Sequence, residues 1–215
     1  MRGLRPASSV RRVLALGAHA DDIEIGAGGT IASLIGSTPG VEVHWVVFSA
    51  VGERAGEARR SARDFCAGAS LHLHLHEFRD GRFPADWDAL KEAVEALARH
   101  VDPDLVFTHR LDDRHQDHRL VAELTWTAFR DHLVLAYEIP KYEGDLGQPD
   151  LYVPLSPEGL DRKIELLDRH FGSQRSKAWF DAETFRGLAR LRGIEAGRGV
   201  RYAEAFHCDK AVLEF

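Results

Sequence analysis

The chain lacks the features that mark secreted and membrane-spanning proteins. Among its 215 residues, no apolar run approaches the roughly 20 residues that a helix needs to span a bilayer, so no membrane insertion is expected. Cysteine is scarce: Cys66 lies in an apolar helical stretch and Cys208 follows the last apolar run, and we expect both to be free thiols. Residues 1–12 are basic but contain no apolar segment of a signal peptide. These absences favour a cytoplasmic protein.

An excess of positive charge is also absent. The net charge of -6 argues against nucleic acid or an anionic membrane surface as the main partner. The apolar fraction of 44% and the charged fraction of 29% are those of an ordinary globular protein. The length predicts a single domain over residues 1–215, and whether this domain forms a homo-oligomer is left open.

Short apolar runs alternate with stretches of helical composition. This pattern predicts an α/β fold with a Rossmann-like, mostly parallel sheet and helices on both faces. Four prolines predict an irregular loop excursion over residues 140–160. The expected strands are residues 13–17, 41–48, 71–76, 105–108, 133–137 and 202–207, and the expected helices are residues 30–35, 53–67, 86–100, 114–129, 162–170 and 182–192.

Histidine is abundant, with 12 in the chain, and the first informative one is His19. His19, Asp21 and Asp22 follow the first expected strand, and an α/β fold collects its site at the carboxyl ends of strands. In a tight turn His19 and Asp22 could bind one ion, and imidazole with carboxylate suits Zn²⁺. Asp21 would then serve as a base. The alternative is that these acidic residues only favour the start of a helix.

The glycines that follow this motif, at positions 26, 28 and 29, do not match a dinucleotide-binding loop or a P-loop. We expect them to allow close backbone packing around the site instead.

A second polar motif, residues 113–118, follows the strand expected at residues 105–108. Asp113 is expected to cap a helix, with Gln116 completing a capping box. His115 and His118 would then lie on one face of the first turn. His118 would complete a His₂Asp set with an open fourth position, as in a catalytic zinc site. His115 would act on the substrate, and Asp117 would orient its ring.

Other interpretations of the second motif stay open. Residues 113–118 nearly match the H-x-H-x-D-H run of metallo-β-lactamase-like two-metal hydrolases, with Asp113 in place of the first histidine. That fold also needs further histidines in a β-rich context, whereas this run opens a helix. A two-metal phosphoesterase, a non-catalytic zinc- or sugar-binding module and a merely solvated helix start are the remaining alternatives.

Together the two motifs resemble those of the PIG-L/LmbE family of zinc-dependent de-N-acetylases. The family pattern A-H-P-D-D followed by G-G-T appears at residues 18–22 and 28–30, and D-x-H-x-D-H appears at residues 113–118. Residues 192–197 and the ending A-E-A-F at residues 203–206 are also similar to the family. Ala20 replaces the usual proline, which loosens the turn but removes no ligand atom.

The resemblance implies an enzyme that removes the acetyl group from the amide nitrogen of an N-acetylated amino sugar, such as an N-acetylglucosamine derivative, or a sugar conjugate. It implies one zinc ion per chain, held by His19, Asp22 and His118. It also implies Asp21 as general base and a charged His115 that stabilises the oxyanion. Fe²⁺ could replace Zn²⁺, because ligand type discriminates poorly between divalent ions.

The family also has an arginine followed three residues later by a glutamate, which Arg54 and Glu57 match. The resemblance makes Arg54 a candidate substrate contact, and a surface ion pair is the alternative. Substrate selectivity is expected from the 140–160 excursion and from the turn at residues 80–82, since loops near a sheet's crevice usually set it.

Three further histidines, His72, His74 and His76, alternate along one expected strand and share one of its faces. Such a trio could bind a metal, but the neighbouring Glu77 points to the opposite face. We therefore expect a polar strand face or a sheet edge. His44 is single and belongs to no motif.

Overall fold

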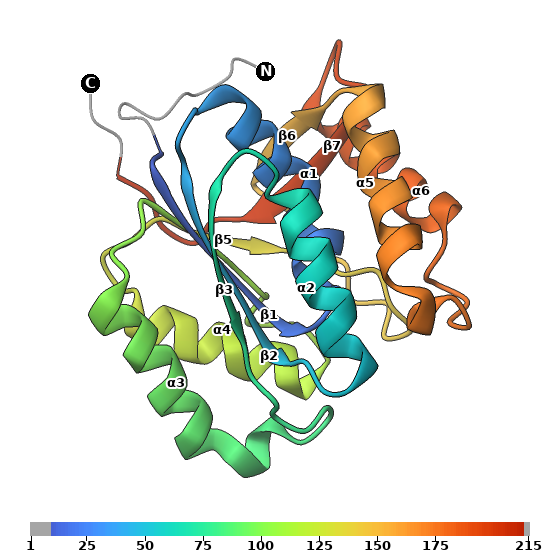
Figure 1. The fold of residues 1–215 in the computed structure, drawn as a ribbon. Coiled ribbons are helices and arrows are strands. Elements are labelled where there is room, and N and C mark those ends of the chain that lie inside the picture. Colours follow the sequence, from blue (N-terminus) through green and yellow to red (C-terminus); the bar gives the residue numbers. More distant parts are fainter. Residues whose placement is uncertain (1–9, 213–215) are drawn as a thin grey trace.

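The computed structural model describes residues 10–212, so most of the basic start of the chain lies outside the described part. One sheet in this part has the strand order β3-β2-β1-β4-β5-β7-β6, with helices on both of its faces (Figure 1). The predicted α/β fold with a mostly parallel sheet is therefore confirmed. The strands are β1 (Arg12–His19), β2 (Glu42–Ser49), β3 (Ser70–Leu75), β4 (Leu105–Thr108), β5 (Val134–Tyr137), β6 (Leu151–Leu155) and β7 (Tyr202–His207).

Helices form the crossovers between the successive parallel strands from β1 to β5, and two further α-helices lie between β6 and β7. Six α-helices and two short 3₁₀-helices lie within residues 10–212. They are α1 (Asp22–Ser37), α2 (Glu53–Phe65), η1 (Phe83–Asp86), α3 (Trp87–His100), α4 (Gln116–Ala128), α5 (Pro157–His170), η2 (Gly172–Gln174) and α6 (Ala182–Ala196).

The direction in which the sheet grows reverses between β1 and β4. From β1 the chain builds β2 and then β3 on one side, and it then crosses to place β4 and β5 on the other side, all in parallel. β7 runs antiparallel between β5 and β6. In open α/β sheets, ligands bind beyond the carboxyl ends of the strands at such a reversal. Both polar motifs follow the two strands that flank it.

Two apolar cores lie on opposite faces of the sheet, because side chains alternate along each strand. Val13 and Ala15 of β1 face the core shared with α1, α2, α5 and α6. Leu14 and Leu16 face the core shared with α3 and α4. In Figure 1 the latter two helices cover one face and the other four lie on the opposite side. β1 is thus buried from both sides, which fixes the position of its carboxyl end.

Helix α1 is much longer than the helix expected at residues 30–35, because it begins directly after the first motif. Gly26, Gly28 and Gly29 weaken the intrinsic preference for a helix, but tertiary packing overrides it. An added Cβ at Gly26 would lie 2.2 Å from the ring of Tyr137, and one at Gly28 would lie 2.6 Å from Phe65. The expectation of close packing at these glycines is confirmed, whereas the expected start of the helix at residue 30 is wrong.

The 140–160 segment is also more regular than expected, because it contains β6 and the start of α5. Pro154 is tolerated in β6 because this strand lies at the sheet edge and pairs only with β7. Pro157 occupies the first turn of α5, where its missing N–H costs nothing, and Ser156 caps the helix.

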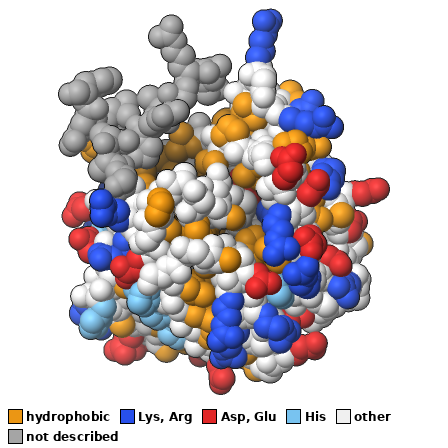
Figure 2. Space-filling model, turned by 45° about the horizontal axis from the view of Figure 1, so that its top comes forward, with side chains coloured by type: hydrophobic (Ala, Val, Ile, Leu, Met, Phe, Trp, Pro, Cys, Tyr) orange, Lys and Arg blue, Asp and Glu red, His pale blue; other side chains and the backbone are white. Residues whose placement is uncertain are grey.

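The remaining expectations concern cysteines and membrane spans. Cys66 and Cys208 are both free thiols, as expected, and burial raises the pKa of the Cys66 thiol to about 12. No helix within residues 10–212 combines the length and apolar character needed to cross a membrane. Acidic and basic side chains are interspersed over the face drawn in Figure 2.

Replacing Gly26 with alanine tests the packing of α1. Because the new Cβ would overlap the ring of Tyr137, we expect Gly26→Ala to lower the free energy of unfolding by about 1–3 kcal/mol. Gly36→Ala in the same helix is the control, since no atom lies within 4 Å of its added Cβ. Urea unfolding should show the loss only for Gly26→Ala, and equal stability of the two variants would contradict this packing.

Candidate metal centre and active-site cleft

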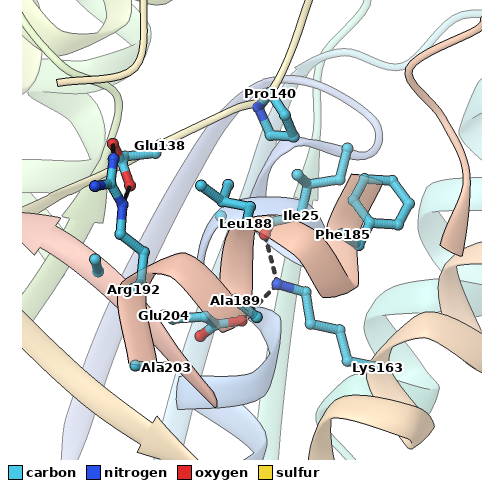
Figure 3. A pocket seen from close by; sticks show the side chains of 12 residues that line it. Ile25, Glu138, Pro140, Lys163, Phe185, Leu188, Ala189, Arg192, Ala203 and Glu204 are labelled. Atoms are coloured by element: carbon cyan, nitrogen blue, oxygen red, sulfur yellow. Dashed lines mark hydrogen bonds and ion pairs between the residues drawn. The ribbon is translucent and has the colours of Figure 1, made fainter. Parts of the chain in front are cut away.

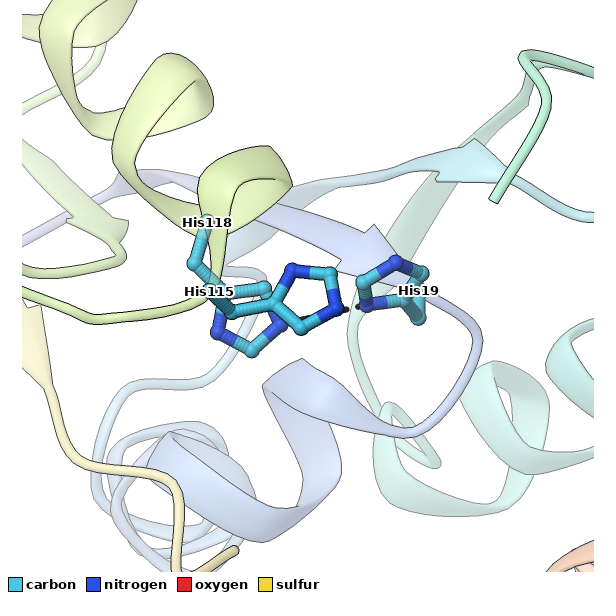
Figure 4. Close-up of side chains that lie close together, drawn as sticks. All are labelled: His19, His115 and His118. Carbon is cyan, nitrogen blue, oxygen red and sulfur yellow. Dashed lines mark hydrogen bonds between the residues drawn. The ribbon is translucent and has the colours of Figure 1, made fainter. Parts of the chain in front are cut away.

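The two polar motifs meet beyond the carboxyl ends of β1 and β4. His19 is the last residue of β1 and Asp22 the first of α1, while His118 lies in the first turn of α4. His19 Nδ1 lies 3.1 Å from His118 Nε2 and 3.4 Å from Asp22 Oδ2. His118 Nε2 lies 3.5 Å from Asp22 Oδ1. Figure 4 shows the rings of His19 and His118 turned toward each other, with His115 beside them.

The distances from His118 Nε2 to His19 Nδ1 and to Asp22 Oδ1 are those expected between ligands of one tetrahedral metal ion. With metal–ligand bonds of about 2.0–2.2 Å, the ligand atoms of such an ion lie roughly 3.3 Å apart. The three side chains are also largely buried, with exposed fractions of 13% for His19, 5% for Asp22 and 3% for His118. A buried set of two imidazoles and one carboxylate therefore has the spacing and chemistry of the implied zinc site.

Each of the two histidine rings has a carboxylate at its other nitrogen. His118 Nδ1 lies 3.0 Å from Asp113 Oδ2, and His19 Nε2 lies 3.3 Å from Asp117 Oδ2. Such partners fix the orientation of metal-binding histidines. Burial lowers the pKa of His118, which leaves its ring neutral and able to bind a metal. Burial alone would raise the pKa of Asp113, but its hydrogen bond to His118 holds it well below the usual range.

The expected capping arrangement at α4 is wrong. The helix begins at Gln116, and the N-cap is His115, whose Nδ1 accepts a hydrogen bond from the backbone N–H of Asp117. Asp113 lies two residues before this N-cap. Its carboxylate accepts a hydrogen bond from the backbone N–H of His115 and contacts both His118 and Lys141. Gln116 closes no capping box and instead donates to the carbonyl of Gly81.

The expected partner of Asp117 is also wrong. Its carboxylate accepts hydrogen bonds from the backbone N–H groups of Gly81 and Phe83, at 2.6 and 3.2 Å, and its ring contact is with His19. It therefore orients His19 rather than His115. The sequence could not show this, because residues 81–83 reach Asp117 only through the fold.

His109 is a site residue to which the sequence assigned no role. It is fully buried, it stacks on His118 with ring centroids 4.0 Å apart, and its Nε2 accepts from the backbone N–H of Ala18. The same nitrogen lies 3.2 Å from Asp22 Oδ2. His109 thus ties the end of β1 to the segment after β4 and supports both motifs.

A cleft of about 780 Å³ opens above these residues. Both segments expected to set selectivity contribute to its lining, through Asp80 and through Lys141 and Tyr142. A third segment, between α5 and α6, also lines the cleft through Lys177 and Trp179, and no motif in the sequence pointed to it. His115 and Asp21 line the same cleft beside the three candidate metal ligands.

Arg54 reaches the site through Asp21. Its Nη2 donates to Asp21 Oδ1 at 2.6 Å, and its Nη1 donates to Ser173 Oγ at 3.3 Å. Glu57 lies three residues further along α2 and is buried, and its Oε2 is 3.5 Å from Arg54 Nη1. Arg54 lines the cleft, so the surface ion pair considered from the sequence does not describe this environment.

A small second cavity is lined by residues of α1, α5, α6 and β7 (Figure 3). Lys163 there donates to Glu204 Oε1 and to the carbonyl of Ile25, both at 2.6 Å. Glu204 also accepts from the backbone N–H groups of Gly29 and Thr30. The ion pair therefore holds the middle of α1. Glu204, the glutamate of the A-E-A-F ending, therefore has a structural role.

Comparison with known proteins shows the family of this chain. The family model described as PIG-L, GlcNAc-PI de-N-acetylase, matches residues 14–129, and the chain belongs to this family of deacetylases. The uncharacterized deacetylase YaiS of Escherichia coli K12 is 27% identical, over 78% of this chain and 94% of the relative. Residues 14–129, which the family model matches, contain both polar motifs.

Solved structures share the fold. The N,N'-diacetylchitobiose deacetylase of Pyrococcus horikoshii is 22% identical with a TM-score of 0.71, over 93% of this chain and 84% of that one. GalB, the 4-carboxy-2-hydroxymuconate hydratase of Pseudomonas putida KT2440, is also 22% identical, with a TM-score of 0.74 over 95% and 98% of the two chains. Because one fold thus serves two reactions, the reaction has to be argued from the site.

Glu24 carries a proton close to this site. It lies fully buried on α1, and burial, together with the charges of Asp21 and Asp22, raises its pKa to about 8 from a usual value of 4.5. Between these two pH values the folded protein keeps the proton and the unfolded chain loses it. The stability that Glu24 contributes therefore falls as pH rises through this range.

Glu24→Gln tests this linkage, because the amide has the shape of the protonated acid and does not titrate. Between about pH 5 and about pH 8, the unfolding free energy of the wild type should fall by a few kcal/mol more than that of the variant. Urea denaturation across this pH range measures the difference. The site histidines are common to both proteins and cancel, so parallel pH profiles would show that Glu24 is not a titrating group.

Proposed function

We propose that this protein is a zinc-dependent hydrolase that removes the acetyl group from the amide nitrogen of an N-acetylated amino sugar or sugar conjugate. The observation that carries the proposal is the meeting of His19, Asp22 and His118 at the base of a cleft, in a chain of the de-N-acetylase family. The name of the Pyrococcus structure, a diacetylchitobiose deacetylase, supports the substrate class.

One zinc ion per chain would be held by His19 Nδ1, Asp22 and His118 Nε2, with Fe²⁺ as the alternative ion. When bound, it supplies Lewis-acid chemistry: it makes water more acidic and polarises the acetamide carbonyl. The fourth position of a three-ligand site is open to solvent and substrate. The carboxylates of Asp113 and Asp117 would keep both rings in the orientation that the ligand set needs.

We propose Asp21 as the general base, because it lines the cleft beside the candidate metal ligands. Arg54 holds its Oδ1, so Oδ2 takes the proton from the attacking water as the new carbon–oxygen bond forms. The same proton then passes to the amide nitrogen as the carbon–nitrogen bond breaks. The products are acetic acid and the amine, which leave as acetate and the protonated amine after the carboxyl proton passes to the amine, and Asp21 ends ionised as it began.

His115 would stabilise the oxyanion, but as a neutral donor. Because its Nδ1 accepts the backbone N–H of Asp117, its proton is on Nε2, the nitrogen available to the cleft. Burial lowers the pKa of His115, which supports a neutral ring in place of the charged one that the resemblance implies. A single donor of this kind contributes about 2.7–4 kcal/mol to transition-state stabilisation.

A two-metal enzyme fits these contacts less well. A second ion near Asp80, His115 and Asp117 would take His19 Nε2 as a ligand, so one imidazole would have to bind two ions through both nitrogens. In addition, Asp117 Oδ2 already accepts the backbone N–H of Gly81 at 2.6 Å. A non-catalytic binding module would bind zinc and release no acetate.

The proposal predicts one cleft-bound zinc per chain together with acetate release from a panel of N-acetylated sugars and sugar conjugates. In His118→Ala the cleft should lose its metal and its activity together. Asp21→Asn, which keeps the hydrogen bond to Arg54, and His115→Ala should keep the metal but lose turnover, by about 10²–10⁴-fold for a proton-transfer group. Elemental analysis and an acetate assay give both readouts.

His100→Ala, at the exposed end of α3, is the matched control and should behave as the wild type. A protein that binds zinc but releases acetate from no member of the panel would be a binding module. Full cleft occupancy in His118→Ala, or unchanged turnover in both Asp21→Asn and His115→Ala, would refute the assigned roles.

The role of Arg54 is decided by separating kcat from KM. We favour a positioning role, because its guanidinium is occupied by Asp21 and Ser173. Arg54→Met should then lower kcat with KM nearly unchanged, and Arg54→Lys should restore part of kcat. If Arg54 is instead the substrate contact that the resemblance implies, the same variant will raise KM with kcat preserved.

A further inference from the structure

A second cluster of metal-binding side chains lies on β2 and β3, at the edge of the sheet. In the parallel register His44 pairs with His72, and Val46 pairs with His74. Paired residues of neighbouring strands share a face, so Glu42, His44, His72 and His74 lie together. β3 is the edge strand that its alternating sequence predicted. The sequence did not indicate that His44 belongs with His72 and His74, because about 30 residues separate it from them.

Three atoms of this cluster converge. His44 Nε2 lies 2.7 Å from Glu42 Oε1, and His72 Nε2 lies 3.5 Å from the same oxygen. The rings of His44 and His72 stack with centroids 4.6 Å apart, and one ligand atom from each of the three residues lies within 4.8 Å of the others. The side chains of His72 and Glu42 are 48% and 31% exposed, so an ion has access from solvent.

The surrounding contacts engage the other polar atoms of Glu42 and His44. Arg12 Nε donates to Glu42 Oε2 at 3.3 Å, which leaves Oε1 for an ion. His44 Nδ1 lies 3.3 Å from His74 Nε2. If His44 Nε2 binds a metal, its proton is on Nδ1 and is donated to His74. Metal-binding histidines typically have such an acceptor at the second nitrogen.

We propose that Glu42 Oε1, His44 Nε2 and His72 Nε2 form a second zinc-binding site, with His74 as a positioning residue. Two imidazoles and a carboxylate match the ligand preference of Zn²⁺, and solvent would occupy the fourth position. The ion links β2 to the edge strand β3 and stabilises the folded chain, because the unfolded chain does not hold the three ligands together. The site is separate from the cleft and does not depend on the proposed function.

The test measures zinc per chain by equilibrium dialysis and elemental analysis of the chelator-stripped full-length protein. We expect two zinc ions in the wild type, one in His72→Ala, one in His118→Ala and none in the double variant. His76→Ala is the matched control, since His76 shares the strand face but lies outside the cluster, against Phe48. It should keep both ions. His72→Ala should also retain the wild-type deacetylation rate.

Affinity and stability give a second readout. His74→Ala should weaken zinc binding at the edge site by about 10–100-fold, as expected for a residue that orients a ligand. Zinc should raise the Tm of His118→Ala but not that of the double variant. The proposal is overturned if folded His72→Ala binds as much zinc as the wild type, or if His76→Ala loses as much as His72→Ala. Unchanged zinc content in His118→Ala would count against the cleft assignment alone.

Discussion

The pairing of β1 with β4 is the constraint on which the candidate active site depends. Neighbouring strands lie about 4.8 Å apart, so side chains that follow two paired strands can share one ion. His19 ends β1, and His118 stands one helical turn beyond the segment that follows β4. The buried ring of His109 reinforces this pairing through the backbone of Ala18 and its stack on His118.

Charge compensation explains why parts of the chain outside the two motifs are drawn to the site. A buried carboxylate is costly unless a partner neutralises it. Lys141, from the chain after β5, contacts Asp113, and Arg54 of α2 contacts Asp21. These two cations anchor the segments that form the cleft wall. The same contacts therefore shape the cleft wall and offset the cost of burying the two carboxylates.

The sequence predicted the parts of the molecule that depend on local pattern. The β–α alternation predicted the fold, and the two motifs named the side chains that meet in the cleft. The length of α1 was underestimated because its glycines are stabilised by Tyr137 and Phe65, which are distant in sequence. The partners of Asp113 and Asp117 were missed for the same reason. The edge cluster required the register of β2 and β3, which no local pattern encodes.

The Lys163–Glu204 pair bears on the stage of chain synthesis at which the metal centre can become rigid. All residues proposed to hold the cleft metal have been synthesised by position 118, yet the helix that begins with Asp22 is held at Gly29 and Thr30 by a carboxylate on the last strand, β7. A nascent chain still lacking β7 would carry every ligand but would lack the carboxylate that holds the middle of α1. β7 therefore completes the set of contacts that hold α1, and with it Asp22, in a fixed position.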